Sequence, residues 1–104
     1  MGGIDTKTAL LQALISGESY GLELIDRIRE ASGGRFVLPQ GMVYPTLRSL
    51  EAKGLVESYD GPPMRERGGR PRRYYRITAD GRKVAEEDAR AFMGFFKPAI
   101  GGAR

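Results

Sequence analysis

The stretch RERGGRPRRYYR, residues 65–76, constrains the fold more than any other part of this chain. It carries six arginines against one acid, Glu66, so its formal charge is +5, while the whole chain of 104 residues carries +4. A segment this charged is costly to bury, and its glycines and proline favour a turn. We therefore expect an exposed basic loop that leads into a strand at residues 74–78.

Three segments before this loop repeat apolar residues at helical spacing, and turn residues separate them. In the second, Leu22, Leu24, Ile25 and Ile28 supply the predicted core side, and Arg27 faces out. Pro45 is tolerable only in the first turn of a helix, so the third helix should start close to Gly41. The predicted helices begin near Asp5 or Thr6 and end at residues 16–17, run from a cap at Ser19 to residues 32–34, and cover residues 41–53.

A hairpin and one more helix complete the predicted order. Residues 55–59 form its first strand, residues 60–63 turn the chain, and the strand at 74–78 returns after the basic loop. Thr78 can cap a last helix at residues 79–97, which Pro98 should end. Three helices followed by a hairpin with a long basic tip predict a mainly α fold with a small β-hairpin, a winged helix-turn-helix.

The composition removes several classes of function. The chain has no cysteine and no histidine, which excludes disulfides, thiolate metal sites and histidine-based catalysis. No apolar run approaches ~18 residues, and the N-terminus does not read as a signal peptide. The carboxylates at residues 86–88 are consecutive, so they point around a helix and read as a solvated face. We expect a cytoplasmic protein that is not an enzyme, without metal, cofactor or membrane.

Three motifs resemble the PadR-like transcriptional regulators. They are SYGLELIDRI at residues 19–28, QGMVYPTLRSLEAKGLVES at 40–58, and GGRPRRYYRIT followed by ADG at 68–81, and the resemblance covers about residues 8–90. Where the family commonly has Gly-Thr-Leu-Tyr-Pro, this chain has Gly-Met-Val-Tyr-Pro at 41–45, which could alter which bases are read.

This resemblance implies a homodimer that binds double-stranded DNA, often a repressor released by a small molecule. The chain looks like the short type of the family, with a single C-terminal helix. We expect residues 1–78 to form the DNA-binding domain, residues 79–98 the dimerisation helix and residues 99–104 a flexible tail.

The start of the third helix is the predicted recognition surface. If Val43, Leu47 and Leu50 face inward, the remaining polar and small residues face out and can touch base edges in a major groove. Gln and Thr side chains can bond bases, and the methyl groups of Met42 or Thr46 can meet a thymine methyl. The predicted outward residues are Gln40, Met42, Pro45, Thr46, Ser49 and Lys53.

Two tyrosines and the wing arginines complete the predicted DNA contacts. Tyr44 is either a tyrosine at the edge of the core or, as the family favours, a phosphate ligand. Tyr20 starts the second helix, whose N-terminus attracts phosphate. The glycines and proline place four arginines in the turn: Arg65, Arg67, Arg70 and Arg72. Arg73 and Arg76 lie on the strand, where one of them can pair with Glu57.

The last helix carries an apolar stripe with small residues first and aromatic residues later: Ala85, Ala89, Phe92 and Phe96, broadened by Met93. It can pack on the first helix of its own chain, or form a dimer interface, which we favour. A hollow between paired last helices could also hold a small aromatic ligand walled by Phe92 and Phe96. A winged helix that binds protein instead of DNA is the alternative function, and a solvated, inactive loop is the alternative for the arginines.

Overall fold

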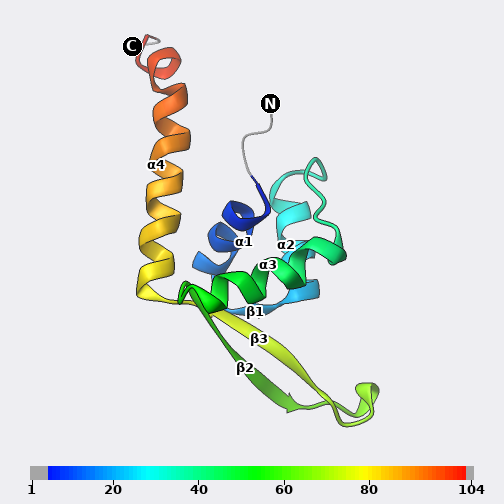
Figure 1. Cartoon of the computed structure of the whole chain (residues 1–104). Coiled ribbons are helices and arrows are strands. Elements are labelled where there is room, and N and C mark those ends of the chain that lie inside the picture. The colour runs from blue at the N-terminus through cyan, green and yellow to red at the C-terminus, as the bar shows by residue number, and fades with distance from the viewer. Residues whose placement is uncertain (1–4, 103–104) are drawn as a thin grey trace.

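The computed structural model describes residues 5–102 of the chain and the side chains of residues 5–91. Three short helices sit above a small antiparallel sheet, a long hairpin projects from the sheet, and the last helix rises beside the first (Figure 1). The elements are α1 (Thr6–Ile15), β1 (Ser19–Tyr20), α2 (Gly21–Ala31), α3 (Gln40–Ala52), β2 (Val56–Pro63), the 3-10 helix η1 (Arg65–Arg67), β3 (Pro71–Ile77) and α4 (Ala79–Gly102). This is the expected winged helix-turn-helix with a C-terminal helix, and β2, η1 and β3 form its wing.

Leucines and a few other apolar side chains fill the core between the helices and the sheet. Leu10 and Leu11 of α1, Leu24 of α2 and Leu47 of α3 are fully buried, which gives each helix one face against the others. Tyr75 of β3 is 5% exposed and closes this core from the sheet side. The core depends on all three helices and the sheet, so it could not form from any one of them alone.

Strand β3 is the central strand of the sheet, in the order β1-β3-β2. Tyr75 pairs with Ser19 of β1 and Ser58 of β2 on the face that meets the helices. Tyr74 pairs with Tyr20 and Tyr59 on the opposite face, because side chains alternate along a strand. The two-residue strand β1 was not expected from the sequence.

The wing is longer than the sequence indicated. The prediction of a turn at residues 60–63 is wrong, since β2 continues to Pro63 with an irregular register between Asp60 and Pro63. Pro63 can sit there because β2 is an edge strand, where a missing N–H is tolerated. The chain reverses later, through η1 and through Gly68 and Gly69, whose φ angles of 67° and 86° favour glycine.

The start of α2 also differs from the expectation. Tyr20 is the residue before the helix, while Ser19 belongs to β1, is buried, and donates its hydroxyl hydrogen to the carboxylate of Glu23. Leu22 is 45% exposed instead of buried. Residues two apart on a helix point about 200° apart, so Leu22 cannot share the core side with Leu24.

Arg27 does not face out as expected. Its Nη1 donates to the carbonyl oxygens of Ala13 at 3.1 Å and Gly17 at 2.8 Å. These carbonyls lie at the C-terminal end of α1, where a positive charge is favoured. Arg27 therefore ties α2 to the end of α1.

Helix α3 begins at Gln40, so Pro45 is its sixth residue and lies beyond the first turn, against expectation. Pro45 removes the N–H that would bond the carbonyl of Gly41. Both residues lie on the exposed side of the helix, where water can satisfy that carbonyl. The helix therefore tolerates a proline that a buried position would not.

The predicted caps at Asp5 and Thr78 are confirmed, but the predicted end of the last helix is wrong. Asp5 accepts the Thr8 N–H at 2.8 Å at the start of α1, and Thr78 Oγ1 accepts the Gly81 N–H at 3.0 Å at the start of α4. Helix α4 continues past Pro98 to Gly102. A proline costs a helix one N–H donor near its end but leaves the bonds on either side in place.

Helix α4 is held to the body at two places. At its start, a Cβ added to Gly81 would overlap the carbonyl oxygen of Leu55, so backbone meets backbone there. Further along, Gln12 Nε2 donates to the Ala85 carbonyl at 2.8 Å, and Thr8 Oγ1 donates to Asp88 at 3.2 Å. Among the residues that the structure describes, no helix is long and apolar enough to cross a membrane.

Replacing Gly81 by Ala should lower the free energy of unfolding by roughly 1–3 kcal/mol, toward the upper end because the neighbour is a carbonyl that cannot rotate away. Gly41 is the matched control: it is helical and exposed, and nothing lies within 4 Å of an added Cβ. Gly41→Ala should gain about 0.5–1 kcal/mol. Urea unfolding at one fixed protein concentration measures both, and equal effects of the two changes would contradict the contact at Gly81.

Candidate nucleic-acid interface

Helix α3 presents one apolar and one polar face. Val43, Leu47 and Leu50 are buried, as the spacing indicated. The outward residues of the sequence analysis are placed accordingly: Gln40, Met42, Pro45, Ser49 and Lys53 are exposed and Thr46 is partly exposed. Met42 is 52% exposed, so its side chain is available to a partner.

These outward residues divide along the helix. Gln40 and Met42 lie at its N-terminal end, on the same side of the molecule as the tip of the wing (Figure 1). Lys53 follows the C-terminal end, near the base of the wing, with roughly 20 Å of helix between the two ends. A duplex that contacts the start of α3 and the tip of the wing would meet Lys53 only at its edge.

Tyr44 packs against the start of α2. A Cβ added to Gly21 would lie 2.6 Å from Tyr44 Cε1 and 2.7 Å from its hydroxyl oxygen. The ring is therefore a structural contact between α3 and α2, and only glycine leaves room for it. Because the hydroxyl ends near the N-terminus of α2, both interpretations of Tyr44 are compatible with this position.

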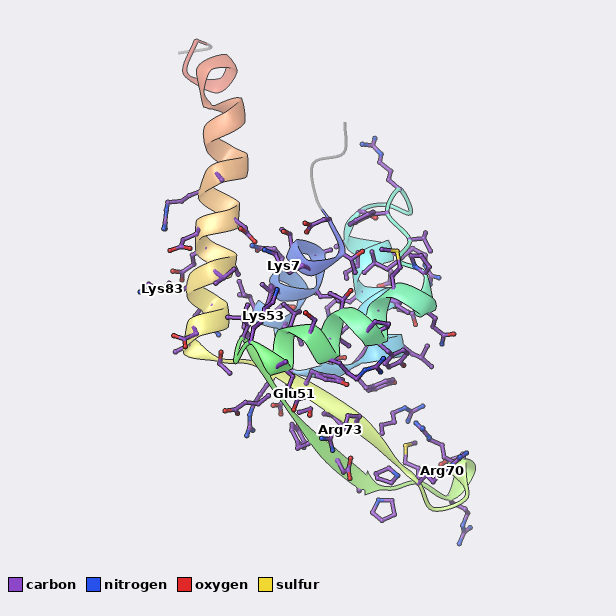
Figure 2. The ribbon with its side chains drawn as sticks, in the orientation of Figure 1. Lys7, Glu51, Lys53, Arg70, Arg73 and Lys83 are labelled. Atoms are coloured by element: carbon purple, nitrogen blue, oxygen red, sulfur yellow. The ribbon has the colours of Figure 1, made fainter. Side chains whose placement is uncertain are left out.

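Three arginines lie at the tip of the wing. Arg65 and Arg67 belong to η1, and Arg70 follows the glycine turn, at the far end of the hairpin (Figure 2). Arg70 Nε donates to the Arg67 carbonyl at 3.0 Å, which holds the stem of its side chain. No ion pair involves these three arginines within the described part of the chain.

Two arginines further along the strand have acidic partners. Arg73 Nη1 lies 2.8 Å from Asp60 Oδ1, and Arg76 Nε lies 3.0 Å from Glu57 Oε1, which confirms a pairing with Glu57. The hydrogen bond to Asp60 raises the pKa of Arg73, and the hydrogen bond to Glu57 raises the pKa of Arg76. Both pairs are half-exposed, where an ion pair stabilises little, so either arginine could exchange its partner for a phosphate.

The sequence placed Arg72 in the turn, and this prediction is wrong. Arg72 lies on β3 and is partly buried. Its guanidinium carbon lies 4.4 Å from the centre of the Tyr20 ring, within the range of a cation–π contact. Tyr20, which was predicted to bind phosphate, presents its ring face to Arg72.

A small hollow of about 230 Å³ gathers predicted residues from three elements. It lies between the start of α2, the start of α3 and the wing. Its walls are Tyr20, Gly21, Leu22, Tyr44, Arg67, Pro71, Arg72 and Arg73. Two tyrosines and three arginines therefore surround the N-terminus of α2, which is where a backbone phosphate would be favoured.

The sequence analysis missed Arg48. It is exposed on α3, directly before the exposed Ser49. A basic residue one position after the inward Leu47, on a helix already assigned to DNA, was the signal that could have found it.

The apolar stripe of α4 is only partly described. Ala85 is fully buried inside its own chain, so it cannot belong to a dimer interface as expected, because α1 already covers it. Ala89 is partly exposed. Phe92, Met93 and Phe96 lie outside the residues whose side chains are described.

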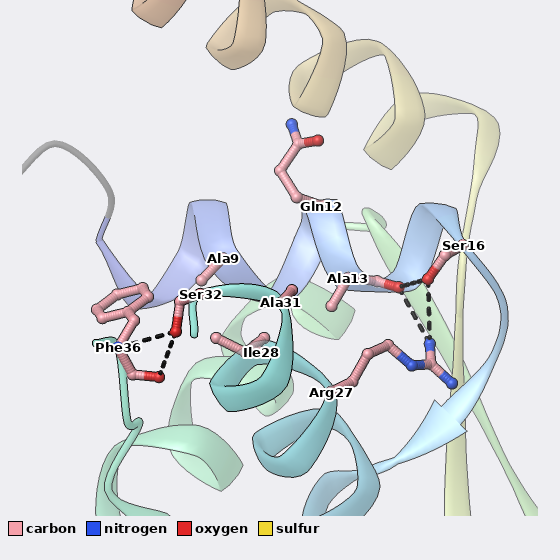
Figure 3. A pocket seen from close by; sticks show the side chains of 9 residues that line it. All are labelled: Ala9, Gln12, Ala13, Ser16, Arg27, Ile28, Ala31, Ser32 and Phe36. Atoms are coloured by element: carbon pink, nitrogen blue, oxygen red, sulfur yellow. Dashed lines mark hydrogen bonds between the residues drawn. The ribbon is translucent and has the colours of Figure 1, made fainter. Parts of the chain in front are cut away.

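A second hollow, of about 400 Å³, lies between α1, α2 and the loop that follows α2 (Figure 3). Its lining is mostly apolar, and Phe36 from the loop before α3 supplies the aromatic wall. The lining residues are Ala9, Gln12, Ala13, Ser16, Arg27, Ile28, Ala31, Ser32 and Phe36. The sequence analysis assigned no role to Phe36, although a lone aromatic after two glycines is a signal of packing.

Acidic residues form no metal site in the described part of the chain, where no group of three potential ligands comes together. Asp88 faces α1 and lies 3.8 Å from Lys7 Nζ, while Glu86 and Glu87 are exposed. The expected solvated face is therefore right for Glu86 and Glu87, whereas Asp88 belongs to the contact between α4 and α1.

An exposed recognition helix beside an arginine-tipped wing defines the winged helix-turn-helix class of DNA-binding proteins. The sequence matches the transcriptional regulator PadR-like family over residues 10–87, so the chain belongs to that family. That family consists of transcriptional regulators and not of enzymes.

Individual relatives agree with this assignment. The transcriptional regulator Rv3488 of Mycobacterium tuberculosis is 39% identical over 74 residues, which are 71% of this chain and 65% of that protein, just under two thirds of its length. A transcriptional regulator from Clostridium thermocellum is 30% identical with a TM-score of 0.77, covering 93% of this chain and 87% of its own. Bacillus subtilis PadR, solved in complex with operator DNA, is 21% identical with a TM-score of 0.68 over 78% of this chain and 43% of its own, and shares the fold.

Proposed function

We propose that this protein represses transcription in the cytoplasm by binding a pseudo-palindromic operator as a homodimer. The observation that carries the proposal is the placement of the start of α3 and the arginine tip of the wing on one side of the molecule (Figure 1). A helix can read a major groove while a wing arginine enters the neighbouring minor groove. The operator complex of the similarly folded Bacillus subtilis PadR supports this use of the fold.

In this proposal the contacts divide into two kinds. Gln40, Met42 and Thr46 read bases, because they occupy the exposed start of α3. Phosphates are held around these base-reading residues by side chains from α3 and the wing. These are Tyr44, Ser49, Lys53, Arg65, Arg67, Arg70 and Arg73, together with Arg48, while Pro45 has no donor and contributes apolar contact only.

A wing that binds protein instead of DNA is the competing function. Arg65 and Arg70 are exposed and have no acidic partner in the described structure, and a wing that binds protein would not explain this. Partner binding that is insensitive to salt would favour it, because contacts to phosphates release counterions and are strongly dependent on salt.

The proposal predicts that the tip of the wing supplies affinity that is independent of sequence. Replacing Arg65 and Arg70 together by Ala should weaken binding to operator and random duplexes alike. The slope of log affinity against log salt should flatten by roughly 0.9 for each phosphate that the protein no longer binds, about 1.8 for each protomer and so about 3.6 for the homodimer. Salt titrations of both duplexes by fluorescence anisotropy measure this.

The matched control removes the same charge elsewhere. Arg35 lies in the loop between α2 and α3 and Lys83 lies on α4, both exposed and outside the wing, so replacing both by Ala should leave the slope unchanged. An unchanged slope in a folded Arg65 and Arg70 double variant would mean that the tip touches no phosphate, and the protein-binding alternative would then be favoured.

Base discrimination should reside at the start of α3. Changing Gln40, Met42 or Thr46 to Ala should cost roughly 1–3 kcal/mol at one position of the operator and leave binding to random duplex nearly intact. Arg48→Ala provides the contrast, because removing a phosphate ligand weakens binding to all sequences. Competition assays with single-base operator variants decide it, and a uniform decrease for all three changes would remove them from the reading surface.

The dimer should form through α4, which stands away from the core beyond its contacts with α1 (Figure 1). Ala89, Phe92, Met93 and Phe96 supply its interface in this proposal, and Phe92 and Phe96 also wall a site for a small aromatic effector. The apolar hollow beside α1 offers such an effector a surface on the first helix.

Equilibrium sedimentation should show a dimer at micromolar concentration, and a half-site duplex should bind more weakly than the full site. A monomer, or equal binding of the two duplexes, would contradict the proposal.

A further inference from the structure

Five side chains form a continuous row on the outer face of the sheet, which we call the wing ladder. Arg72 covers the Tyr20 ring at 4.4 Å, and Tyr20 meets Tyr74 edge to face with ring centres 5.5 Å apart. Tyr74 stacks on Tyr59 at 5.6 Å with an angle of 16° between the rings, and Arg76 lies 5.2 Å from the centre of the Tyr59 ring. The row therefore has cations at its ends and aromatic rings in its middle.

The strand register places all five members on one face. Tyr20, Tyr74 and Tyr59 are directly paired across β1, β3 and β2, and Arg72 and Arg76 lie two residues to either side of Tyr74. Residues two apart on a strand share a face. A Cβ at Gly61 would lie 2.5 Å from the Tyr74 ring, so the neighbouring strand also leaves room for the ladder.

Arg72 is held differently from the other arginines of the wing. Its Nη1 donates to Met64 Sδ at 2.8 Å, and its Nε is buried without a hydrogen-bond partner among the residues described. Arg73 and Arg76, by contrast, each reach a carboxylate. The Tyr20 ring is thus the main partner of the Arg72 guanidinium, which would have to leave that ring to bind a phosphate.

The ladder lies where the wing leaves the body. Strand β1 pairs only with Tyr74 and Tyr75, so the part of the hairpin beyond these residues runs out without a third strand beside it (Figure 1). Tyr20 is also the residue before α2, and Gly21 directly after it receives the Tyr44 ring of α3. Contacts therefore run without a break from the wing through Tyr20 to the recognition helix.

We propose that Arg72 and Tyr20 are positioning residues, which set the direction of the wing relative to α2 and α3 and do not themselves hold phosphate. The distance from the arginine tip to the start of α3 then depends on this contact. For its effect on DNA the inference rests on the proposed function, whereas its effect on the wing does not.

The first test measures the direction of the wing without DNA. The chain has no cysteine, so Glu30→Cys on α2 and Glu66→Cys on the wing accept one spin label each, and both positions are exposed. Labelled chain is diluted with unlabelled chain, so that each pair of labels reports one chain even in a dimer. Pulsed electron resonance gives the distribution of distances for the otherwise unchanged chain, Arg72→Gln, Tyr20→Leu and both together.

Arg72→Gln and Tyr20→Leu should broaden this distribution to a similar extent, and the double variant should broaden it no further. Arg70→Ala, at the tip, should leave it narrow. Tyr20→Phe keeps the ring and should also leave it narrow, which tests the ring contact if Tyr20→Leu does not fold. An unchanged distribution in folded Arg72→Gln would overturn the inference.

The second test separates positioning from phosphate binding. Arg72→Gln should weaken operator binding by roughly 2- to 5-fold, the range of a cation–π contact at a partly exposed site, and leave the salt slope unchanged. Tyr20→Leu should weaken binding about as much, and the double variant little more than either single one. A slope flattened by about 0.9 for each protomer in Arg72→Gln, with unchanged affinity in Tyr20→Leu, would identify a phosphate ligand and overturn the inference. If the unchanged chain bound no DNA, the proposed function would fail while the label distances would still decide the ladder.

Discussion

The two faces of strand β3 lie in different surroundings, and the parts of the protein that meet DNA depend on keeping them apart. Tyr75 points into the helical core and is buried, while its neighbour Tyr74 points to the outer face and stacks with other rings. Since side chains alternate with a period of two, a slip of one residue in the register would exchange them. Two adjacent residues of the same type thus have different roles: Tyr75 packs in the core and Tyr74 packs against the rings on the outer face.

Two glycines let helices start in close contact with the rest of this small core. At Gly81 the start of α4 meets the Leu55 carbonyl, and at Gly21 the start of α2 receives the Tyr44 ring. Neither position has a positive φ, so the requirement there is for space and not for an unusual conformation. The first contact fixes where α4 leaves the body, and the second fixes α3 against the start of α2.

Local signals in the sequence were sufficient for the order of the main elements and for the caps at Asp5 and Thr78. These two side chains bond free N–H groups three residues later, and the spacing of Val43, Leu47 and Leu50 placed the core side of α3. These features depend on nearby residues, which is why they could be predicted.

Tertiary contacts decided what the sequence analysis missed. Strand β1 has two residues, too few for a pattern of alternation, and exists because β3 pairs with it. Asp60 and Gly61 resemble a turn locally but extend β2, since Gly61 lies beneath the Tyr74 ring. The placement of Arg72 in the turn followed from that error, and its contact with Tyr20 joins residues fifty-two positions apart, beyond the reach of any local pattern.

The arginines of the wing show why charge counted along a sequence overstates contact with DNA. At long range all six contribute, because a duplex approaching within a Debye length of about 8–10 Å responds to the summed charge. At contact only a guanidinium that can reach beyond the protein surface is useful. Arg73 and Arg76 each pair with a carboxylate, and Arg72 lies over a ring. The three arginines at the tip are therefore the best placed to reach a phosphate. In the proposed mode of binding, the same stretch thus attracts DNA with its whole charge, contacts phosphates with part of that charge, and uses the remainder to hold the wing in the direction that these contacts need.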